Sequence, residues 1–137
     1  MKVLSIQYPC LVDEPKMMVT VIHGSYPNPK LAKRCVALWD TGASDTTLSE
    51  KAVKLLGLER VEGMEPKPVR TANGIVMSYA YWAYVQFDPQ WPQMKMPVWS
   101  MPHSDVEMLI GMDVISRGVF RLWPQDGKTM LSFALPI

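Results

Sequence analysis

Residues 35–39 form an uninterrupted apolar run that stops at Asp40, Thr41 and Gly42. A run of this length that ends in turn-forming residues is typical of a β-strand buried on both faces. A second apolar run, rich in β-branched residues, occupies residues 17–22, and a turn-like stretch with glycine, proline and asparagine follows it. We therefore expect the two runs to pair as a β-hairpin with a wide loop.

Two dipeptides that end in glycine predict further hairpins. Asn73-Gly74 favours a type I′ turn, because both residues tolerate positive φ angles, and Asp126-Gly127 is expected to form the turn of the last hairpin. The strands expected on either side are residues 69–72 and 75–78 for the first turn, and residues 119–123 and 130–135 for the second. Shorter strands are expected at residues 96–99 and 108–110.

One segment has the pattern of a helix. Ser49 can cap its N-terminus, Gly57 can end it, and the residues between them supply an apolar face. A single further helical turn is expected at residues 114–117. The predicted fold class is therefore all-β with one or two short helices. The expected apolar face of the first helix consists of Ala52, Val53, Leu55 and Leu56.

The length and charge of the chain exclude several classes of function. With 137 residues the chain fits one domain, which is too small for two lobes with a cleft between them. A net charge of +1 does not favour a nucleic-acid groove or a polybasic membrane surface. No apolar run has the length of a membrane span or the form of a secretory signal, so we expect a cytoplasmic protein without nucleic-acid or membrane partners.

The cysteines and histidines lack the spacing of a metal site. Cys10 and Cys35 lie far apart in the sequence, and His23 and His103 stand alone. Zinc ligands usually occur as closely spaced pairs, so we expect neither a metal nor another cofactor. Both cysteines are interpreted as small buried apolar residues in strands, and a disulfide between them stays open. His103 is interpreted as an exposed loop residue.

Asp40 ends the buried strand and enters a tight turn, so that its carboxylate has an apolar strand behind it and solvent in front. The order of parts around it resembles the retropepsin family, the retroviral and cellular single-domain aspartic proteases. These parts are an Asp-Thr-Gly-Ala strand end, a helix, a hairpin, the triplet Leu109-Ile110-Gly111, a short helix and a closing strand. The resemblance covers roughly residues 17–135. It implies a closed, barrel-like acid-protease fold, in which residues 109–111 pack behind the Asp-Thr-Gly loop.

The resemblance also implies roles for individual residues. Asp40 matches the catalytic aspartate, and Thr41 matches the residue whose hydroxyl links two active-site loops across a dimer. Gly42 matches the residue whose carbonyl meets the substrate backbone. The residues implied to bind substrate are Ala43 in the wall of the site and, at the tip of a flap that closes over the substrate, Ala72, Asn73 and Gly74.

Several neighbouring residues are interpreted as structural or as departures from the family pattern. Ser44 stands where retroviral enzymes have an acidic residue, and the hairpin tip has one glycine rather than several, so the substrate preference is expected to differ. Asp45 can bind the substrate backbone or bond within its own loop, and we favour the local bond. Asp113 is expected to pair with Arg117 or to cap the short helix, and Trp39 is expected in the core.

The sequence contains a single Asp-Thr-Gly, whereas this type of peptide hydrolysis uses two carboxylates that share one proton. The second carboxylate is therefore expected from Asp40 of another copy, across a two-fold axis. The implied protein is a homodimeric aspartic endopeptidase that acts on polypeptides. Residues 17–137 are its expected protease domain, and residues 1–16 an N-terminal extension of unknown role. The alternatives are a non-proteolytic dimeric peptide-binding module on the same fold, and an unrelated β-barrel in which Asp-Thr-Gly occurs by coincidence.

Overall fold

The computed structural model describes residues 1–25, 28–102 and 105–136, so the interpretation of His103 lies outside the described residues. Strands dominate the described part, which confirms the predicted all-β class with two short helices. The elements are β1 (Lys2–Gln7), β2 (Lys16–Ser25), β3 (Asn28–Trp39), β4 (Thr47–Ser49), α1 (Glu50–Leu56), β5 (Lys67–Thr71), β6 (Gly74–Ser78), β7 (Ala80–Gln86), β8 (Met94–Met101), β9 (Met108–Ile110), α2 (Met112–Ile115), β10 (Val119–Gln125) and β11 (Lys128–Leu135).

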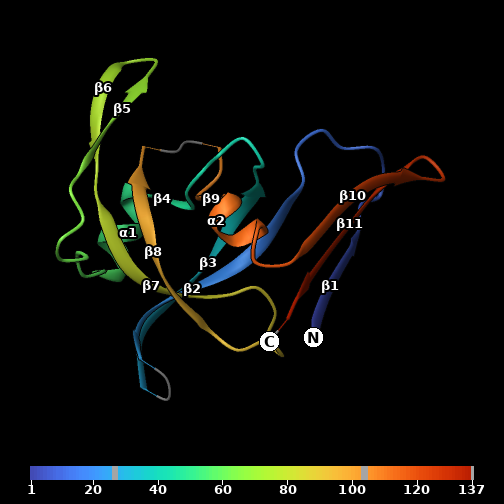
Figure 1. Ribbon diagram of the computed structural model, residues 1–137, viewed down its shortest axis with the longest axis horizontal. Helices are drawn as coiled ribbons and strands as arrows, with labels where there is room; N and C mark the ends of the chain where they lie inside the picture. The colour runs from blue at the N-terminus through green and yellow to red at the C-terminus, as the bar shows by residue number, and fades with distance from the viewer. Residues whose placement is uncertain (26–27, 103–104, 137) are drawn as a thin grey trace.

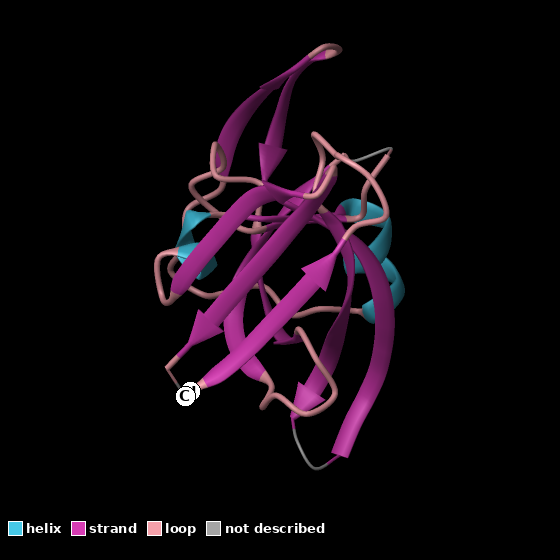
Figure 2. Ribbon diagram, turned by 90° about the vertical axis from the view of Figure 1, so that its right-hand side faces the viewer, coloured by secondary structure: helices cyan, strands magenta, loops and turns pink. Residues whose placement is uncertain are grey.

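A closed barrel forms the body of the molecule. Its strand order is β2-β3-β9-β4-β8-β7 (Figure 1), and it confirms the predicted barrel-like fold. β2 and β3 pair antiparallel, which confirms the expected hairpin, but the pairing continues to Ser25 and Asn28, so the expected wide loop is wrong. β9 pairs parallel with β3 and brings Ile110 beside Trp39. Figure 2 shows the two helices on opposite sides of these strands.

A separate three-stranded sheet, in the order β1-β11-β10, extends beside the barrel (Figure 1). β1 pairs antiparallel with β11 over its whole length. The turn between β10 and β11 consists of Asp126 and Gly127, whose φ angles are 52° and 74°. Positive φ at both positions matches a type I′ turn, so the turn is where the sequence predicts it. Residues 2–7 thus form an edge strand of this sheet.

The hairpin of β5 and β6 forms a two-stranded sheet of its own and projects from the barrel (Figure 1). Thr71 pairs with Gly74, so the central turn residues are Ala72 and Asn73. Gly74 has a φ angle of 110° and Asn73 does not have a positive φ, so the predicted type I′ turn at Asn73-Gly74 is wrong by one residue. The hydroxyl of Thr71 favours this register, because it donates to the Gly74 carbonyl at 2.8 Å and accepts from Asn73 N–H at 3.2 Å.

Both caps of α1 are those predicted. The Ser49 side chain accepts a hydrogen bond from Ala52 N–H at 3.1 Å, and Gly57 ends the helix with a φ angle of 63°. Three of the four expected apolar residues are buried, but Leu55 is 62% exposed and was wrongly placed on the buried face. A helix of two turns buries only a narrow face against the barrel, and Leu55 lies outside that face.

The second helix starts at Met112, two residues before the expected turn at residues 114–117. Its N-terminal boundary follows Gly111 directly. Within the described ranges, no helix has the length and apolar character needed to cross a lipid bilayer.

An aromatic cluster surrounds Trp39 at the end of β3 and joins the barrel to the three-stranded sheet. Trp39 is 4% exposed, which confirms it as a core residue. Its ring centre lies 5.1 Å from that of Phe133, 5.2 Å from Phe120 and 5.8 Å from Phe87. Offset and tilted ring pairs of this kind add specific contacts to the burial of apolar surface. The residue before Asp40 is therefore held by both the barrel and the three-stranded sheet.

The two cysteines occupy different environments. Cys35 is fully buried in β3, as predicted, whereas Cys10 is exposed and lies in no strand, so its predicted burial is wrong. Both thiols are free, which resolves the open question of a disulfide.

Candidate active site

Asp40 is the first residue after β3, the barrel strand that pairs with β9. Its backbone N–H donates to the Ile110 carbonyl oxygen at 2.9 Å. Its Oδ1 accepts a hydrogen bond from Gly42 N–H at 2.9 Å, and Ala43 N–H donates to its carbonyl oxygen at 3.2 Å. Asp40 is half-buried, whereas Thr41 and Gly42 are exposed. The loop thus orients the carboxylate and leaves its outer side open to a ligand or another chain.

The segment after β9 packs against the inner side of this loop. A Cβ atom on Gly111 would lie 2.6 Å from the carbonyl carbon of Asp45 and 2.9 Å from the carbonyl oxygen of Ala43, so only glycine fits there. Met112 N–H donates to that Ala43 oxygen at 2.8 Å. These contacts confirm that residues 109–111 pack behind the loop.

A hydrogen-bond cluster joins the loop to α2. The Asp113 carboxylate accepts from the hydroxyl of Thr46 at 2.7 Å and from its backbone N–H at 3.0 Å. The same hydroxyl accepts from Gly111 N–H at 3.1 Å, and Thr46 is fully buried. Arg117 donates to the backbone carbonyl oxygen of Asp113 and not to its carboxylate, so the expected pairing of these two side chains is wrong. Asp113 Oδ1 also accepts a hydrogen bond from Val114 N–H at 2.9 Å, so the carboxylate does bond the first turn of α2, although the residue at the cap position is Gly111.

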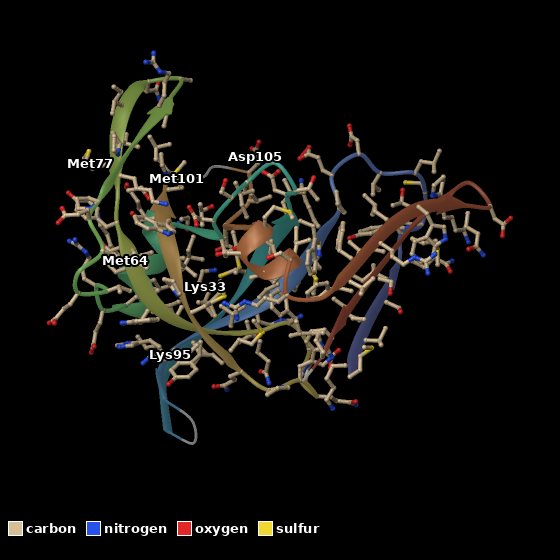
Figure 3. All side chains as sticks on the ribbon, viewed as in Figure 1. Lys33, Met64, Met77, Lys95, Met101 and Asp105 are labelled. Carbon is tan, nitrogen blue, oxygen red and sulfur yellow. The ribbon has the colours of Figure 1, made fainter. Side chains whose placement is uncertain are left out.

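The residues predicted at the flap tip lie at the far end of the β5–β6 hairpin. Ala72, Asn73 and Gly74 are all exposed, and in the described part of the chain no hydrogen bond or ion pair joins them to the Asp40 loop. Figure 3 shows Met77 of this hairpin and Met101 of β8 on the same side of the molecule. The hairpin thus stands free at its tip and meets the barrel at its base.

The base of the hairpin contacts the loop through one ion pair. Lys67 Nζ, at the start of β5, lies 2.6 Å from Asp45 Oδ2. The prediction that Asp45 bonds within its own loop is therefore wrong. A partner 22 residues away in sequence replaces the local bond, because the hairpin folds back beside the loop.

The sequence matches the profile of a protein family described as "gag-polyprotein putative aspartyl protease" over residues 32–117, more than half of the chain. The chain belongs to this aspartyl protease family. The matched stretch contains the Asp40 loop, the β5–β6 hairpin and the Gly111 segment of this retropepsin-like aspartic protease. No curated protein matches the chain significantly.

Solved structures with the same fold include three proteases or protease-like domains. A retropepsin-like aspartic protease from Rickettsia conorii matches with a TM-score of 0.60 and 19% identity, over 99% of this chain and 96% of that one. EIAV protease in complex with the inhibitor HBY-793 matches with a TM-score of 0.54 and 16% identity, over 81% and 92%. The retroviral protease-like domain of Ddi1 from Leishmania major matches with a TM-score of 0.51 and 12% identity, over 90% of this chain and 96% of that one. These likenesses establish the retropepsin fold of the chain.

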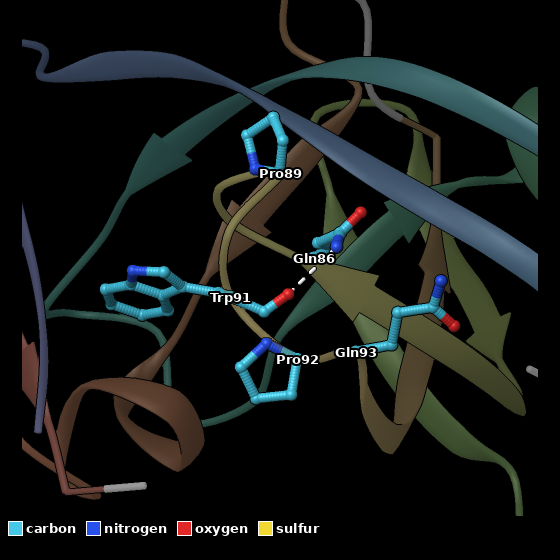
Figure 4. Close-up of a pocket in the computed structure, with 5 residues that line it drawn as sticks. All are labelled: Gln86, Pro89, Trp91, Pro92 and Gln93. Carbon is cyan, nitrogen blue, oxygen red and sulfur yellow. Dashed lines mark hydrogen bonds between the residues drawn. The ribbon is translucent and has the colours of Figure 1, made fainter.

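Two cavities of this retropepsin-like protease differ in their relation to Asp40. One, of about 300 Å³, is lined by Asp40 itself. The other, of about 430 Å³, lies in the connection between β7 and β8, away from the predicted site residues. Figure 4 shows its lining, in which Gln86 Nε2 donates to the Trp91 carbonyl oxygen at 2.9 Å.

Sequence reasoning missed the contacts of Thr46 and Lys67. Thr46 is a buried polar residue directly after the loop, but nothing local marks it as a partner of Asp113. The sequence signal that pointed toward these contacts is the triplet Leu109-Ile110-Gly111. Once β9 is paired with β3, the residue after Gly111 and Met112 has to lie beside the loop that follows Asp40.

Proposed function

We propose that the protein is a homodimeric aspartic endopeptidase, in which Asp40 of one protomer and Asp40 of its partner form the catalytic dyad. The observation that carries this proposal is the position of Asp40, a half-buried carboxylate at the end of a barrel strand with exposed Thr41 and Gly42 beside it. Membership of an aspartyl protease family supports the chemistry. Because the sequence has one Asp-Thr-Gly, a second copy has to supply the other carboxylate.

The proposed reaction uses two carboxyl groups that hold one proton between them, because like charges at about 3 Å do not both ionise readily. The ionised carboxylate accepts a proton from a water molecule, and the protonated group polarises the peptide carbonyl. The water oxygen bonds to the carbonyl carbon, and the C–N bond breaks as the nitrogen takes up a proton. General acid–base catalysis of this kind contributes on the order of 10²–10⁴-fold.

The other site residues act in binding and assembly in this proposal. The Thr41 hydroxyl links the two Asp40 loops across the dimer, and the Gly42 carbonyl and Ala43 meet the substrate backbone. The exposure of Thr41 and Gly42 supports these contacts, since a second chain or a peptide can reach them. Residues 17–137 form the proposed protease domain.

The β5–β6 hairpin is the proposed flap. It is a two-stranded sheet of its own, and its tip residues are exposed. Both properties suit a segment that moves over a bound peptide, because few buried contacts oppose the movement. The tip residues proposed to contact substrate are Ala72, Asn73 and Gly74.

The test is a peptide-library digest with the wild type, Asp40→Asn and the control Asp126→Asn, which makes the same change in an exposed turn. We expect the wild type to cleave, Asp126→Asn to match it, and Asp40→Asn to lose on the order of 10²–10⁴-fold or more. A bell-shaped pH profile on the acid side of neutral is expected, because the pair has to hold one proton. Cleavage that persists in Asp40→Asn would refute the mechanism, and peptide binding without any cleavage would favour a non-proteolytic module.

Assembly is tested separately by sedimentation and by dilution. Specific activity is expected to fall as the protein is diluted below the dissociation constant of the dimer, because the monomer holds one carboxylate. A protein that cleaves peptides with undiminished specific activity while it sediments as a monomer would contradict a dyad built from two copies.

A further inference from the structure

The cavity of about 300 Å³ beside Asp40 extends between two other parts of the chain. Residues 13–15 line one part of it, and Phe120 and Leu122 of β10 line another. Leu38 and Trp39 of β3, together with Asp40 and Thr41 directly after it, complete the lining. A polypeptide that binds at Asp40 therefore places a neighbouring side chain within reach of this cavity.

The part of the lining formed by residues 13–15 is anchored on both sides. The Pro15 carbonyl oxygen accepts a hydrogen bond from Trp39 N–H at 3.1 Å. Val12 N–H donates to the hydroxyl of Thr129 in β11 at 2.8 Å. These bonds hold the segment before β2 against the three-stranded sheet and the end of β3, so its backbone has a defined position beside Asp40.

Carboxylates line the cavity without a cation among them. Asp13, Glu14 and Asp40 all belong to its lining, which includes no lysine or arginine in the described part of the chain. Lys16 approaches Glu14 to 3.9 Å, but both side chains are exposed and such a pair contributes little. In the proposed dimer a second Asp40 adds to the negative charge. The cavity is therefore complementary to a positively charged group.

The uncharged part of the lining suits the stem of a long side chain. Phe120 is half-buried and Leu122 is 46% exposed, so both offer apolar surface. Trp39 is 4% exposed and belongs to the core behind the cavity.

We propose that this cavity binds a lysine or arginine side chain of the polypeptide substrate next to the bond that is cleaved, and that Asp13 and Glu14 select for it. The apolar stem of such a side chain packs on Phe120 and Leu122 while its charged head reaches the carboxylates. The inference rests on the proposed endopeptidase function and deepens it by naming a substrate class. It also gives the N-terminal segment a role in specificity.

The first experiment compares substrates. Peptides that differ only by lysine or methionine at one position are digested by the wild type, with each position around the cleaved bond tested in turn. We expect one fixed position at which lysine raises kcat/KM by at least about tenfold over methionine, equivalent to about 1.4 kcal/mol. Raised salt concentration is expected to reduce this preference, because salt screens the exposed carboxylates. Equal cleavage of both peptides at every position overturns the inference.

The second experiment changes the protein. Asp13→Asn/Glu14→Gln removes two charges with little change in shape, and Glu62→Gln/Asp126→Asn removes the same charge at exposed positions outside the cavity lining. The lysine-to-methionine ratio of kcat/KM is expected to fall to about one to two in the first variant and to persist in the control. Glu14→Lys is expected to reverse the preference toward glutamate. A ratio that is the same in all variants overturns the assignment.

A binding measurement separates this inference from the proposed function. Fluorescent lysine and methionine peptides are titrated into Asp40→Asn, with and without the changes at Asp13 and Glu14. If the wild type cleaves nothing but the lysine peptide binds about tenfold tighter through Asp13 and Glu14, the endopeptidase proposal fails and the specificity site stands. If the protein neither binds nor cleaves the peptides, both the endopeptidase proposal and the specificity site are overturned. The changes at Asp13 and Glu14 could instead alter the dissociation constant of the dimer and leave the preference for lysine over methionine unchanged. That result overturns the inference too, because a partner protomer then fills the cavity.

Discussion

Lys67 holds its ammonium group 2.6 Å from Oδ2 of Asp45 and 3.9 Å above the ring centre of Trp99. Asp45 continues the loop that begins at Asp40, and Trp99 lies in β8. One lysine at the start of β5 therefore ties the base of the β5–β6 hairpin to the loop and to the barrel. Because the rest of the hairpin is a separate two-stranded sheet, this contact is placed to set its direction.

We predict that Lys67→Met weakens activity more than stability. The ion pair is exposed, so its loss changes the free energy of unfolding by about 1 kcal/mol or less. Peptide cleavage is expected to fall about three- to tenfold, since about 1 kcal/mol of lost positioning changes a rate by that order. Lys67→Arg keeps the cation and is expected to stay near the wild type. Urea denaturation and kcat/KM are measured on both variants, and an unchanged kcat/KM for Lys67→Met would count against a positioning role.

Thr46→Val is predicted to destabilise the fold strongly. The substitution keeps the shape but removes the hydroxyl that donates to Asp113 and accepts from Gly111 N–H. A hydrogen bond to a charged group contributes about 1.5–3 kcal/mol, and we expect a loss in this range. The check is the urea midpoint of the variant against that of Ser116→Ala, a change at an exposed site. Equal midpoints would show that the cluster contributes nothing measurable.

The two thiols are predicted to react very differently. Burial raises the pKa of the Cys35 thiol to about 11, and the residue is fully buried in β3. Because the thiolate is the reactive species, Cys35 should resist alkylation in the folded protein at pH 8 while exposed Cys10 reacts. Mass spectrometry after iodoacetamide treatment is expected to show one label in native protein and two in urea. Labelling of native Cys10→Ser, whose remaining cysteine is Cys35, would contradict the structure.

The ion pair of Lys33 with Glu107 makes stability depend on pH. Burial alone raises the pKa of Glu107, but hydrogen bonds from Lys33 and from Val36 N–H outweigh it, so the net pKa is lowered. The pKa of Lys33 is raised, chiefly by its hydrogen bond to Glu107. A lowered carboxyl pKa contributes stability above the unfolded value, and that contribution is lost as the pH falls through the folded value. The raised lysine pKa acts at the alkaline end, so neutral pH retains both contributions.

Glu107→Gln tests this dependence. At pH 7 the variant is expected to be less stable than the wild type by about 1 kcal/mol or less, because the two side chains are partly exposed. The gap should close as the pH falls below the pKa of the folded carboxyl. Urea midpoints at a series of pH values provide the measurement. A gap of constant size from neutral to acid pH would mean that packing, and not charge, accounts for it.

Local patterns predicted the elements of this fold well where neighbouring residues decide them. Ser49 and Gly57 cap α1 as expected, and Asp126-Gly127 forms the expected turn, because cap bonds and φ preferences involve residues a few positions apart. The errors arise where a competing contact intervenes. The turn near Asn73 moved by one residue because the Thr71 hydroxyl bonds across it.

The candidate site divides in the same way. The loop that begins at Asp40 and its need for Gly111 follow from a motif and a repeated apolar pattern in the sequence. The partners of Asp45 and Asp113 did not follow, since a carboxylate has several plausible nearby donors and the sequence does not rank them. The exposure of Cys10 was missed for a related reason, because burial depends on what covers a segment.

By itself, the sequence determined an all-β chain with an Asp-Thr-Gly at the end of a buried strand, because strand, turn and cap preferences act over a few residues. Only the tertiary structure decided which distant groups meet. Thr46 reaches Asp113 because β9 pairs in one register with β3, and residues 13–15 reach Asp40 because the N-terminal segment is bonded to β11 and to Trp39. Contacts of this kind depend on the path of the whole chain, which no local pattern specifies.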